Sequence, residues 1–463
     1  MAVYRQIYDR ARAAIADGRL LPGARLPSAR NLAAQLGAAR GTVDAAYAML
    51  AGEGWIVRRG PAGTVVAPQL APGQRAAPAA AMPVPGHSSG VFATDMPVAP
   101  FRMGLPALDA FPRKLWARLV AREVRALSPA AMNYPDPAGW PPLREAIAAY
   151  LGIARGIACT PAQIIVTGGY QGALALIGRT LIEPGDGVWF EDPGYYQARL
   201  GLLAAGARLL PLAVDAQGMC VEDGVVRAPQ AAFAVVTPAH HSPLGVTLSL
   251  PRRLALLSWA AAARAWVVED DYDGEFHYAG RPLPALKSLD RDDVVLYAGS
   301  FSKVLFPALR LGYLVVPQNL VERFVRAAHA CDAGQSRLEQ GVVAAFMAEG
   351  HFARHLNRMR RLYAARRAAL AAALATVFGE RLRVELQGGG MHLLGRPAGD
   401  ASDDELVRLA MAEGLMPGAL SLHRVARDPG AGLLLSFTNI AENHAEGAAQ
   451  ALLRAIGDRL PPG

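Results

Sequence analysis

The sequence predicts two folds in one chain of 463 residues: a small α+β winged helix-turn-helix domain, then a larger α/β domain that ends in a small α/β subdomain. Apolar residues recur at helical spacing through the first 52 residues, and two short apolar runs follow around a Gly-Pro turn. From about residue 91 onward, strand-like apolar runs alternate with Ala-rich helical stretches, which is typical of a parallel sheet covered by helices. A chain of this length is also too long for a single hydrophobic core.

Two helices and a turn open the small domain. Residues 3–17 predict an amphipathic helix that ends at Gly18, and residues 20–28 form a turn segment. Ser28 can accept a backbone N–H as the N-cap of a second helix. This helix is expected to end at Gly37, because glycine readily adopts the left-handed conformation that closes helices.

A third helix and a hairpin complete the small domain. Residues 42–52 are expected to be helical, with one buried face formed by Val43, Ala46, Tyr47 and Leu50. Residues 55–59 and 64–66 flank a turn at 60–63 and are predicted to form a β-hairpin. Three helices followed by a hairpin are the elements of a winged helix-turn-helix, in which the third helix would enter the major groove of DNA.

The side chains that open the last two helices, together with the hairpin arginines, are the predicted DNA contacts. These candidates are Ser28, Arg30, Arg40, Thr42, Arg58 and Arg59. The first two can hold phosphate at a helix N-terminus, the middle two can reach base edges or phosphates, and the hairpin pair can enter the minor groove. Residues 1–70 carry nine Arg and four Asp or Glu, a net +5 of the chain's +8, which also favours a polyanionic partner.

The composition gives no indication of export or membrane insertion. No uninterrupted apolar stretch reaches the length of about 18 residues that a membrane span needs. The N-terminus lacks the apolar core of a signal peptide. Three scattered cysteines (Cys159, Cys220 and Cys331) match neither a metal-binding spacing nor a disulfide framework, so we expect no metal site. We therefore expect a cytoplasmic protein.

Composition also predicts the domain boundaries. Residues 1–68 are the predicted DNA-binding domain, and residues 69–90, rich in Pro, Ala and Gly, are a predicted linker with no core of its own. Residues 91–463 form the predicted α/β domain, with a large part over about 91–340 and a small subdomain over about 341–463. The strand candidates of the large part are residues 163–166, 187–190, 232–236, 266–268 and 294–297.

Lys303 is the most informative residue of the α/β domain, because only three of the 47 Lys and Arg residues are lysines. A lysine amine can condense with an aldehyde to form a Schiff base, whereas a guanidinium cannot. Upstream, an apolar run ends in an acidic cluster over residues 269–273. A strand that ends in aspartate, followed by a Ser-x-Ser-Lys loop, predicts a site for pyridoxal 5'-phosphate (PLP).

The physical requirements of PLP select the other candidates. Asp270 is expected to keep the pyridine nitrogen protonated, and Asp271, which should face the other way along the strand, is the near alternative. Tyr272 is expected to hydrogen-bond the phenolic oxygen of the ring, and Tyr195 to stack on its face. The phosphate candidates are Ser300, Ser302 and Arg310 near the lysine, with Gly169, Tyr170 and Gln171 at a strand-to-helix turn.

Two sets of motifs resemble known families. The N-terminal motif is similar to that of GntR-type regulators and comprises Gly18-x-Leu20, Pro22-Gly23, Leu26-Pro27-Ser28-x-Arg30, Arg40-x-Thr42-Val43 and Glu53-Gly54. The chain from about 95 to 455 resembles the fold-type-I aminotransferases, and within them the MocR (GabR-like) regulators. The motifs that carry this resemblance are Asn133-Tyr134-x-Asp136-Pro137, Glu269-Asp270-Asp271-Tyr272-Asp273 and Gly299-Ser300-Phe301-Ser302-Lys303. The resemblance implies a PLP-dependent transferase fold, a homodimer with PLP bound at Lys303 near the interface, and operator DNA as a partner.

Two departures from the aminotransferase pattern bear on activity. Leu434 fills the position at which aminotransferases carry the arginine that grips the substrate carboxylate. Residues 240–245 replace the family's turn that carries an asparagine contacting the ring oxygen, so this asparagine is either replaced by Ser242 or absent. Both changes favour a domain that retains PLP and senses a ligand over a competent α-amino acid transaminase.

These observations predict a PLP-dependent transcriptional regulator. Its aminotransferase-like domain would sense an amine or amino-acid effector through Schiff-base exchange at Lys303, or would sense PLP itself. An active aminotransferase with a vestigial DNA-binding domain is the rival interpretation. We lean against an enzyme, although the retained lysine leaves residual transamination open.

Overall fold

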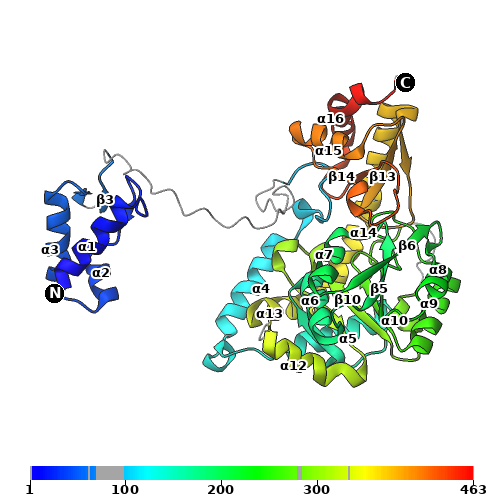
Figure 1. Cartoon of the computed structure of the whole chain (residues 1–463), viewed down its shortest axis with the longest axis horizontal. Helices are drawn as coiled ribbons and strands as arrows, with labels where there is room; N and C mark the ends of the chain where they lie inside the picture. The colour runs from blue at the N-terminus through cyan, green and yellow to red at the C-terminus, as the bar shows by residue number, and fades with distance from the viewer. Residues whose placement is uncertain (1–2, 61–62, 69–97, 279–283, 332–333, 462–463) are drawn as a thin grey trace. The chain divides into compact units, whose positions relative to one another are not determined.

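The structure, a computed structural model, describes residues 3–60, 63–68, 98–278, 284–331 and 334–461. The chain forms two compact units that divide after Met96, and each is described by itself. The first unit is the blue part of Figure 1. The predicted linker over residues 69–90 lies outside the described residues.

The first unit has three helices and a small three-stranded sheet of order β1-β3-β2. Its elements are α1 (Val3–Ala16), β1 (Arg25–Leu26), α2 (Ala29–Leu36), α3 (Arg40–Gly52), β2 (Ile56–Arg58) and β3 (Thr64–Val66). Ser28 caps α2 by accepting the N–H of Asn31, and Gly37 closes it with a φ of 59°, as predicted. The predicted inner face of α3 is fully buried.

Two details of the first unit differ from the sequence prediction. α3 begins at Arg40, two residues earlier than expected, because Ala39 acts as the N-cap without any side-chain hydrogen bond that the sequence could signal. The predicted turn segment contains β1, in which Arg25 pairs with Val65 of the hairpin. A two-residue strand has no alternation to reveal it, so only the pairing with β3 defines it.

The second unit is built around an eight-stranded sheet of order β4-β11-β10-β9-β8-β5-β6-β7. The strands are β4 (Ile164–Thr167), β5 (Gly187–Asp192), β6 (Arg208–Asp215), β7 (Gly218–Met219), β8 (Phe233–Val236), β9 (Trp266–Asp271), β10 (Val295–Ser300) and β11 (Gly312–Val315). Helices cover the sheet (Figure 1), namely α4 (Arg113–Ala126), α5 (Pro141–Ala154), α6 (Gly169–Leu181), α7 (Tyr196–Ala204), α8 (Val221–Arg227), α9 (Leu250–Ala263), α10 (Leu286–Leu289), α11 (Phe301–Val304), α12 (Val321–Cys331) and α13 (Arg337–Ala348).

All five predicted strands are present, but the sheet is not purely parallel. β11 runs antiparallel to both β10 and β4, and β7 runs antiparallel to β6. The connection from β10 to β11 spans residues 301–311 and contains only short helical turns. A parallel return needs a crossover of about a dozen residues or more, usually a full helix, so this connection reverses the chain.

The last part of the chain forms a smaller subdomain around a four-stranded antiparallel sheet of order β12-β13-β15-β14. Its elements are α14 (His351–Phe378), β12 (Leu382–Glu385), β13 (His392–Pro397), α15 (Asp403–Ala412), β14 (Gly418–Ala419), β15 (Leu433–Ser436) and α16 (Ala445–Ile456). One hydrophobic core runs from the large sheet into this subdomain.

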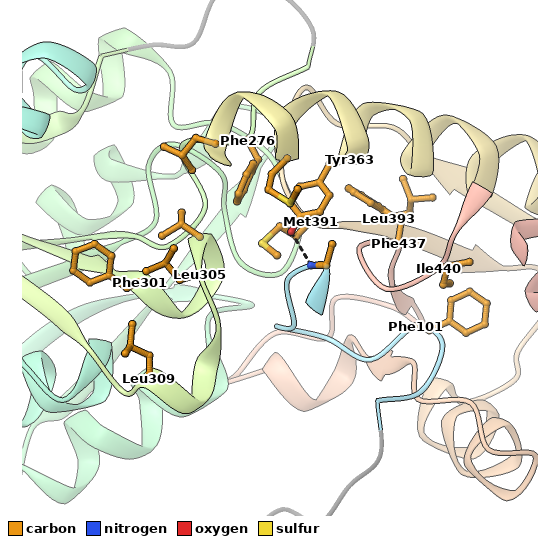
Figure 2. Packing of buried hydrophobic residues seen from close by; sticks show 14 of the residues in the cluster. Phe101, Phe276, Phe301, Leu305, Leu309, Tyr363, Met391, Leu393, Phe437 and Ile440 are labelled. Atoms are coloured by element: carbon orange, nitrogen blue, oxygen red, sulfur yellow. Dashed lines mark hydrogen bonds between the residues drawn. The ribbon is translucent and has the colours of Figure 1, made fainter. Parts of the chain in front are cut away.

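Figure 2 shows where the segment that opens the second unit enters this core. Phe101 is fully buried near Phe437, and the backbone N–H of Ala107 donates to the Tyr363 hydroxyl at 2.9 Å. The carbonyl oxygen of Phe101 accepts a hydrogen bond from the N–H of Ser436 in β15. Residues 98–107 are thus fixed against the small subdomain. Within the described part of the chain, no helix combines the length and apolar character required to cross a membrane.

Candidate functional site

Two neighbouring parallel strands bring the predicted cofactor residues to one edge of the large sheet. β9 and β10 pair in parallel, with Asp270 opposite Ala298. Since the carboxyl ends of parallel strands meet at the same edge, the end of β9 and the helix α11 that follows β10 open on one side. Asp270 comes from the first and Lys303 from the second.

The Lys303 amine is held by a segment that is far away in sequence. Its Nζ donates to the carbonyl oxygen of Gly104 at 2.8 Å. Gly104 has a φ of +80°, which favours glycine, and a Cβ at this position would lie 2.7 Å from Nζ and would push the lysine side chain aside. Burial lowers the pKa of the Lys303 amine, while the charges of Asp273 and Asp270 act in the opposite direction. A lowered pKa favours the neutral amine, which is the form that attacks an aldehyde.

The two aspartates at the end of β9 have different surroundings. Asp271 forms a buried ion pair with Arg155 and accepts a hydrogen bond from the Tyr297 hydroxyl at 2.6 Å. Burial raises the pKa of Asp270 well above its ordinary value, Asp271 and Asp273 add to this, and Lys303 opposes it. The charge of Lys303 thus acts on Asp270, whereas Asp271 is engaged by Arg155 and Tyr297.

Arg310 and the start of α6 form the part of the site suited to an anion. Arg310 Nη2 donates to the carbonyl oxygen of Gly168 at 3.1 Å, and its guanidinium lies 3.9 Å from where a Cβ of Gly169 would be. The N-terminal amides of α6, beginning at Gly169, open beside this exposed arginine. Ser300 caps α11, where its Oγ accepts the N–H of Ser302 at 3.1 Å.

Two tyrosines occupy the same side of the sheet edge as Asp270. The ring centroids of Tyr170 and Tyr195 are 6.1 Å apart. Burial raises the pKa of both phenols, and the charge of Asp270 adds to the effect. The Tyr195 hydroxyl and the Gln171 amide both donate to Gln197 Oε1 at 3.0 Å. The buried Tyr170 hydroxyl interacts with the Asp270 carboxyl group, which raises the pKa of the phenol through its charge and through hydrogen bonding.

Tyr272 contacts a histidine from the loop that follows β8. The Tyr272 hydroxyl lies 2.9 Å from His240 Nδ1, and the same nitrogen lies 3.1 Å from Asp273 Oδ2. The next residue, His241, has its Nε2 at 3.5 Å from Glu191 Oε2. The loop thus places two histidines against buried carboxyl groups.

Leu434 is part of a small apolar cluster and not of a polar pocket. It is 1% exposed and packs with Leu394, Leu420, Met103 and Leu244. Met103 directly precedes Gly104, whose carbonyl oxygen holds the Lys303 amine. The position that would hold a carboxylate-binding arginine is therefore filled by packed aliphatic side chains.

The predicted DNA contacts lie on α2, α3 and the hairpin of the first unit. Arg30, Arg40, Arg58 and Arg59 are exposed, Thr42 is half-buried, and the exposed Ser28 caps α2. Arg40 Nε lies 3.4 Å from Asp44 Oδ2, and Arg58 Nη2 donates to the carbonyl oxygen of Asp44 at 3.0 Å. Asp44 thus orients two of the predicted arginines.

Two residues of this arrangement were missed by sequence reasoning. Gly104 lies 199 residues before Lys303, and nothing in its local sequence indicates that its carbonyl oxygen would meet the lysine. Asp273 was noted only as part of the acidic cluster. A buried carboxyl group two residues beyond a strand end could have been recognised as a candidate from its proximity to Tyr272.

Buried titratable groups predict how the stability of the second unit depends on pH. Burial raises the pKa of Glu191 to about 8 and those of Glu269 and Glu275 to about 7. Burial also lowers the pKa of four histidines, to about 3 for His241 and His392 and about 4 for His355 and His423. The glutamates bind protons more tightly in the folded chain, so their contribution is lost as pH rises from about 4.5 to about 8. The histidine contribution is lost as pH falls below about 6.5.

We therefore expect the free energy of unfolding to be greatest between about pH 5 and pH 6.5 and to fall by at least about 1 kcal/mol by about pH 9. Urea unfolding followed by tryptophan fluorescence at a series of pH values measures this. The same free energy at pH 6 and pH 9 would contradict the assignment of these carboxyl groups as buried and protonated.

Comparison with known proteins gives matches over both units. Residues 3–66 match the model described as bacterial regulatory proteins, gntR family, and residues 109–416 match the model of class I and II aminotransferases. The probable rhizopine catabolism regulatory protein MocR of Rhizobium meliloti is 38% identical over 95% of this chain and 90% of its own length. The pyridoxine biosynthesis transcriptional regulator PdxR of Corynebacterium glutamicum is 32% identical over 99% of this chain and 96% of its own length.

Among solved structures, the aminotransferase LysN of Thermus thermophilus superposes with a TM-score of 0.71. It is 29% identical, and the match covers 77% of this chain and 92% of LysN. That structure holds a phosphopyridoxyl-leucine adduct. The regulators therefore match both units, whereas LysN leaves nearly a quarter of this chain unmatched.

Proposed function

This chain belongs to the MocR subfamily of GntR-type transcriptional regulators, and on that basis we propose that it binds operator DNA and that PLP at Lys303 controls this binding. The observation that carries the proposal is the combination of a GntR-type domain with a retained lysine site in an aminotransferase fold. We further propose that it acts as a homodimer in the cytoplasm, as the family resemblance implies.

The residues around Lys303 fit PLP. Its aldehyde would meet the Lys303 amine, its pyridine nitrogen would meet Asp270, and its phosphate would lie between Arg310 and the amides that open α6. The buried Lys303 amine and the buried Asp270 carboxyl group, each of which affects the pKa of the other, are the two partners that the aldehyde and the ring nitrogen need. When bound, PLP would supply an electrophilic carbon to which an amine can attach.

Side chains of the site would position the ring and the incoming amine. Asp270 would hold a proton toward the pyridine nitrogen, and Tyr195 would cover the ring face. Lys303 would be the group that an effector amine displaces, so its side chain would then be a free amine. Lys303 could then donate to the carbonyl oxygen of Gly104, as it does here.

The apolar cluster around Leu434 limits which effectors the site can bind. A carboxylate placed among Leu434, Leu394 and Leu420 would lose its hydration without gaining a cation. We propose that the effector is PLP itself or an amine without a carboxylate next to its amino group. The rival interpretation, an aminotransferase with a vestigial DNA-binding domain, is disfavoured because the relatives that match the whole chain are regulators.

The function is tested by fluorescence anisotropy with DNA from upstream of the gene and a scrambled duplex of equal length. We expect the full-length protein to prefer the native duplex, and its affinity to differ between the PLP-free and PLP-loaded forms. No preference for the native duplex in either form would overturn the proposed regulator.

Removing the side chains that open α3 is expected to weaken this binding. Arg40→Ala should reduce operator affinity by about 1–3 kcal/mol if it contacts a base edge, or lower the slope of log affinity against log salt by about one if it contacts phosphate. Thr42→Ala should act in the same direction. Arg19→Ala, which removes an equally basic residue that pairs with Asp17 on the turn after α1, is the matched control and should change affinity little.

A further inference from the structure

Asp273 is a buried carboxyl group whose partners are incomplete. It is 1% exposed, and neither of its oxygens receives a hydrogen bond of normal geometry among the described residues. The nearest polar atom is Nδ1 of His240, at 3.1 Å from Oδ2. A buried carboxylate without a donor is costly, so this contact indicates where a hydrogen must lie.

The same nitrogen also lies 2.9 Å from the Tyr272 hydroxyl. If neither Nδ1 nor the Asp273 carboxyl group carried a hydrogen, two lone pairs would face each other across this contact with nothing between them. If Nδ1 carries a hydrogen, that hydrogen can be shared between Asp273 and the Tyr272 oxygen. A carboxylate beside one ring nitrogen is the usual device that fixes the histidine tautomer. Tyr272 then accepts from His240, so its own O–H hydrogen points to another acceptor, which is either the nearby Asp273 carboxyl group or a group in the cofactor site.

The fold keeps the His240 ring in this position. A Cβ at Gly390 would lie 2.0 Å from the ring, and one at Gly245 would lie 2.9 Å from Nε2. The His392 ring is 5.6 Å away, and its Nε2 is 2.8 Å from the carbonyl oxygen of Pro243. Two glycines and a second histidine therefore confine His240, which allows Nδ1 to stay between Tyr272 and Asp273.

We propose that Asp273 and His240 are positioning residues that turn the Tyr272 hydroxyl hydrogen away from His240 and into the cofactor site. The inference rests on the proposed function, because the acceptor it implies is the phenolic oxygen of PLP. Asp273 fixes the hydrogen on Nδ1, Nδ1 donates to Tyr272, and Tyr272 donates into the site. No proton changes its covalent partner along this chain. The other titratable groups that face it are Asp270, His241, Tyr278, His392 and Lys303.

The tautomer is measured first, on the PLP-free full-length protein, by ¹⁵N NMR of labelled histidines. The His240 resonances are assigned by their loss in His240→Gln. We expect the hydrogen on Nδ1 in the native protein and on Nε2 in Asp273→Asn, because the asparagine amide can donate to Nδ1. A native protein with its hydrogen on Nε2 would overturn the proposal. This measurement needs no cofactor, so its outcome is independent of whether the proposed function holds.

The coupling to Tyr272 is measured next, in the PLP-loaded protein, through the pH midpoint of its visible absorbance. Asp273→Asn is compared with and without Tyr272→Phe in a double-mutant cycle. If Asp273 acts partly through Tyr272, the midpoint shift should differ by about one pH unit between the two backgrounds. Equal shifts with and without Tyr272→Phe would show that Asp273 acts only through its charge, which would contradict the proposal.

His423→Gln is the matched control, since it changes another histidine whose ring nitrogen lies 3.1 Å from a backbone carbonyl oxygen, that of Gly194, and that takes no part in holding His240. Its shift should be the same in both backgrounds. If the native protein showed no visible absorbance with PLP at all, the proposed function would fail, while the NMR result would still decide the tautomer.

Discussion

A Lys303→Ala variant is expected to lose the visible absorbance of bound PLP completely and to bind DNA with an affinity that PLP no longer changes. Alanine has no amine to condense with the aldehyde, and no other lysine is available near the site. Lys287 on α10 is paired with Asp290 and Asp293, and Lys114 is on α4. Absorbance after removal of free PLP, followed by DNA anisotropy with and without PLP, measures both effects.

Lys303→Arg separates the chemistry of the lysine from its charge. A guanidinium keeps the positive charge but does not form the carbon–nitrogen double bond, so this variant should also lack the absorbance. Lys114→Ala, which changes an exposed lysine, should behave like the native protein. If DNA binding by Lys303→Ala still depended on PLP, the protein would sense PLP without a covalent bond to Lys303. This result would contradict the role given to Lys303.

The elements that the sequence predicted well are those defined by local chemistry. Ser28 and Gly37 bound α2 because a hydroxyl N-cap and a left-handed glycine act within one helical turn. The strands that end in Asp271 and Ser300 were visible as apolar runs because they are buried on both faces. Alternation along β9 also anticipated that Asp270 and Asp271 would face opposite ways.

What the sequence could not show depends on distant pairings. The reversed direction of β11 is a property of its neighbours β10 and β4, since its residues alone read as an ordinary buried strand. The contact between Lys303 and Gly104 joins segments whose local patterns are unrelated. The site assignments for Asp270, Tyr272 and Arg310 remain predictions about a ligand, although the fold brings these residues to one edge of the sheet.

Arg155 lies among three buried carboxyl groups, those of Asp271, Glu269 and Glu275. Its replacement is therefore expected to lower the free energy of unfolding strongly. Its Nη2 pairs with Asp271, and its Nη1 donates to the carbonyl oxygen of Gly274 at 3.1 Å. Its charge also lowers the pKa values of Glu269 and Glu275, against the stronger opposing effect of burial. The Tyr297 hydroxyl donates to the same carboxylate oxygen of Asp271 as Arg155 does.

Arg155→Ala is therefore expected to destabilise the second unit by about 3–5 kcal/mol, because it leaves a buried carboxylate without its cation. Denaturant unfolding followed by tryptophan fluorescence measures the change. Arg252→Ala is the matched control, because Arg252 also pairs with an aspartate but Asp215 has a side chain that is 50% exposed, and its loss should cost no more than about 1 kcal/mol. Adding Asp271→Asn to Arg155→Ala should recover part of the loss, since the unpaired charge is then removed as well. Equal costs for Arg155→Ala and Arg252→Ala would show that water reaches Asp271 and that this ion pair does not hold the edge of the sheet together.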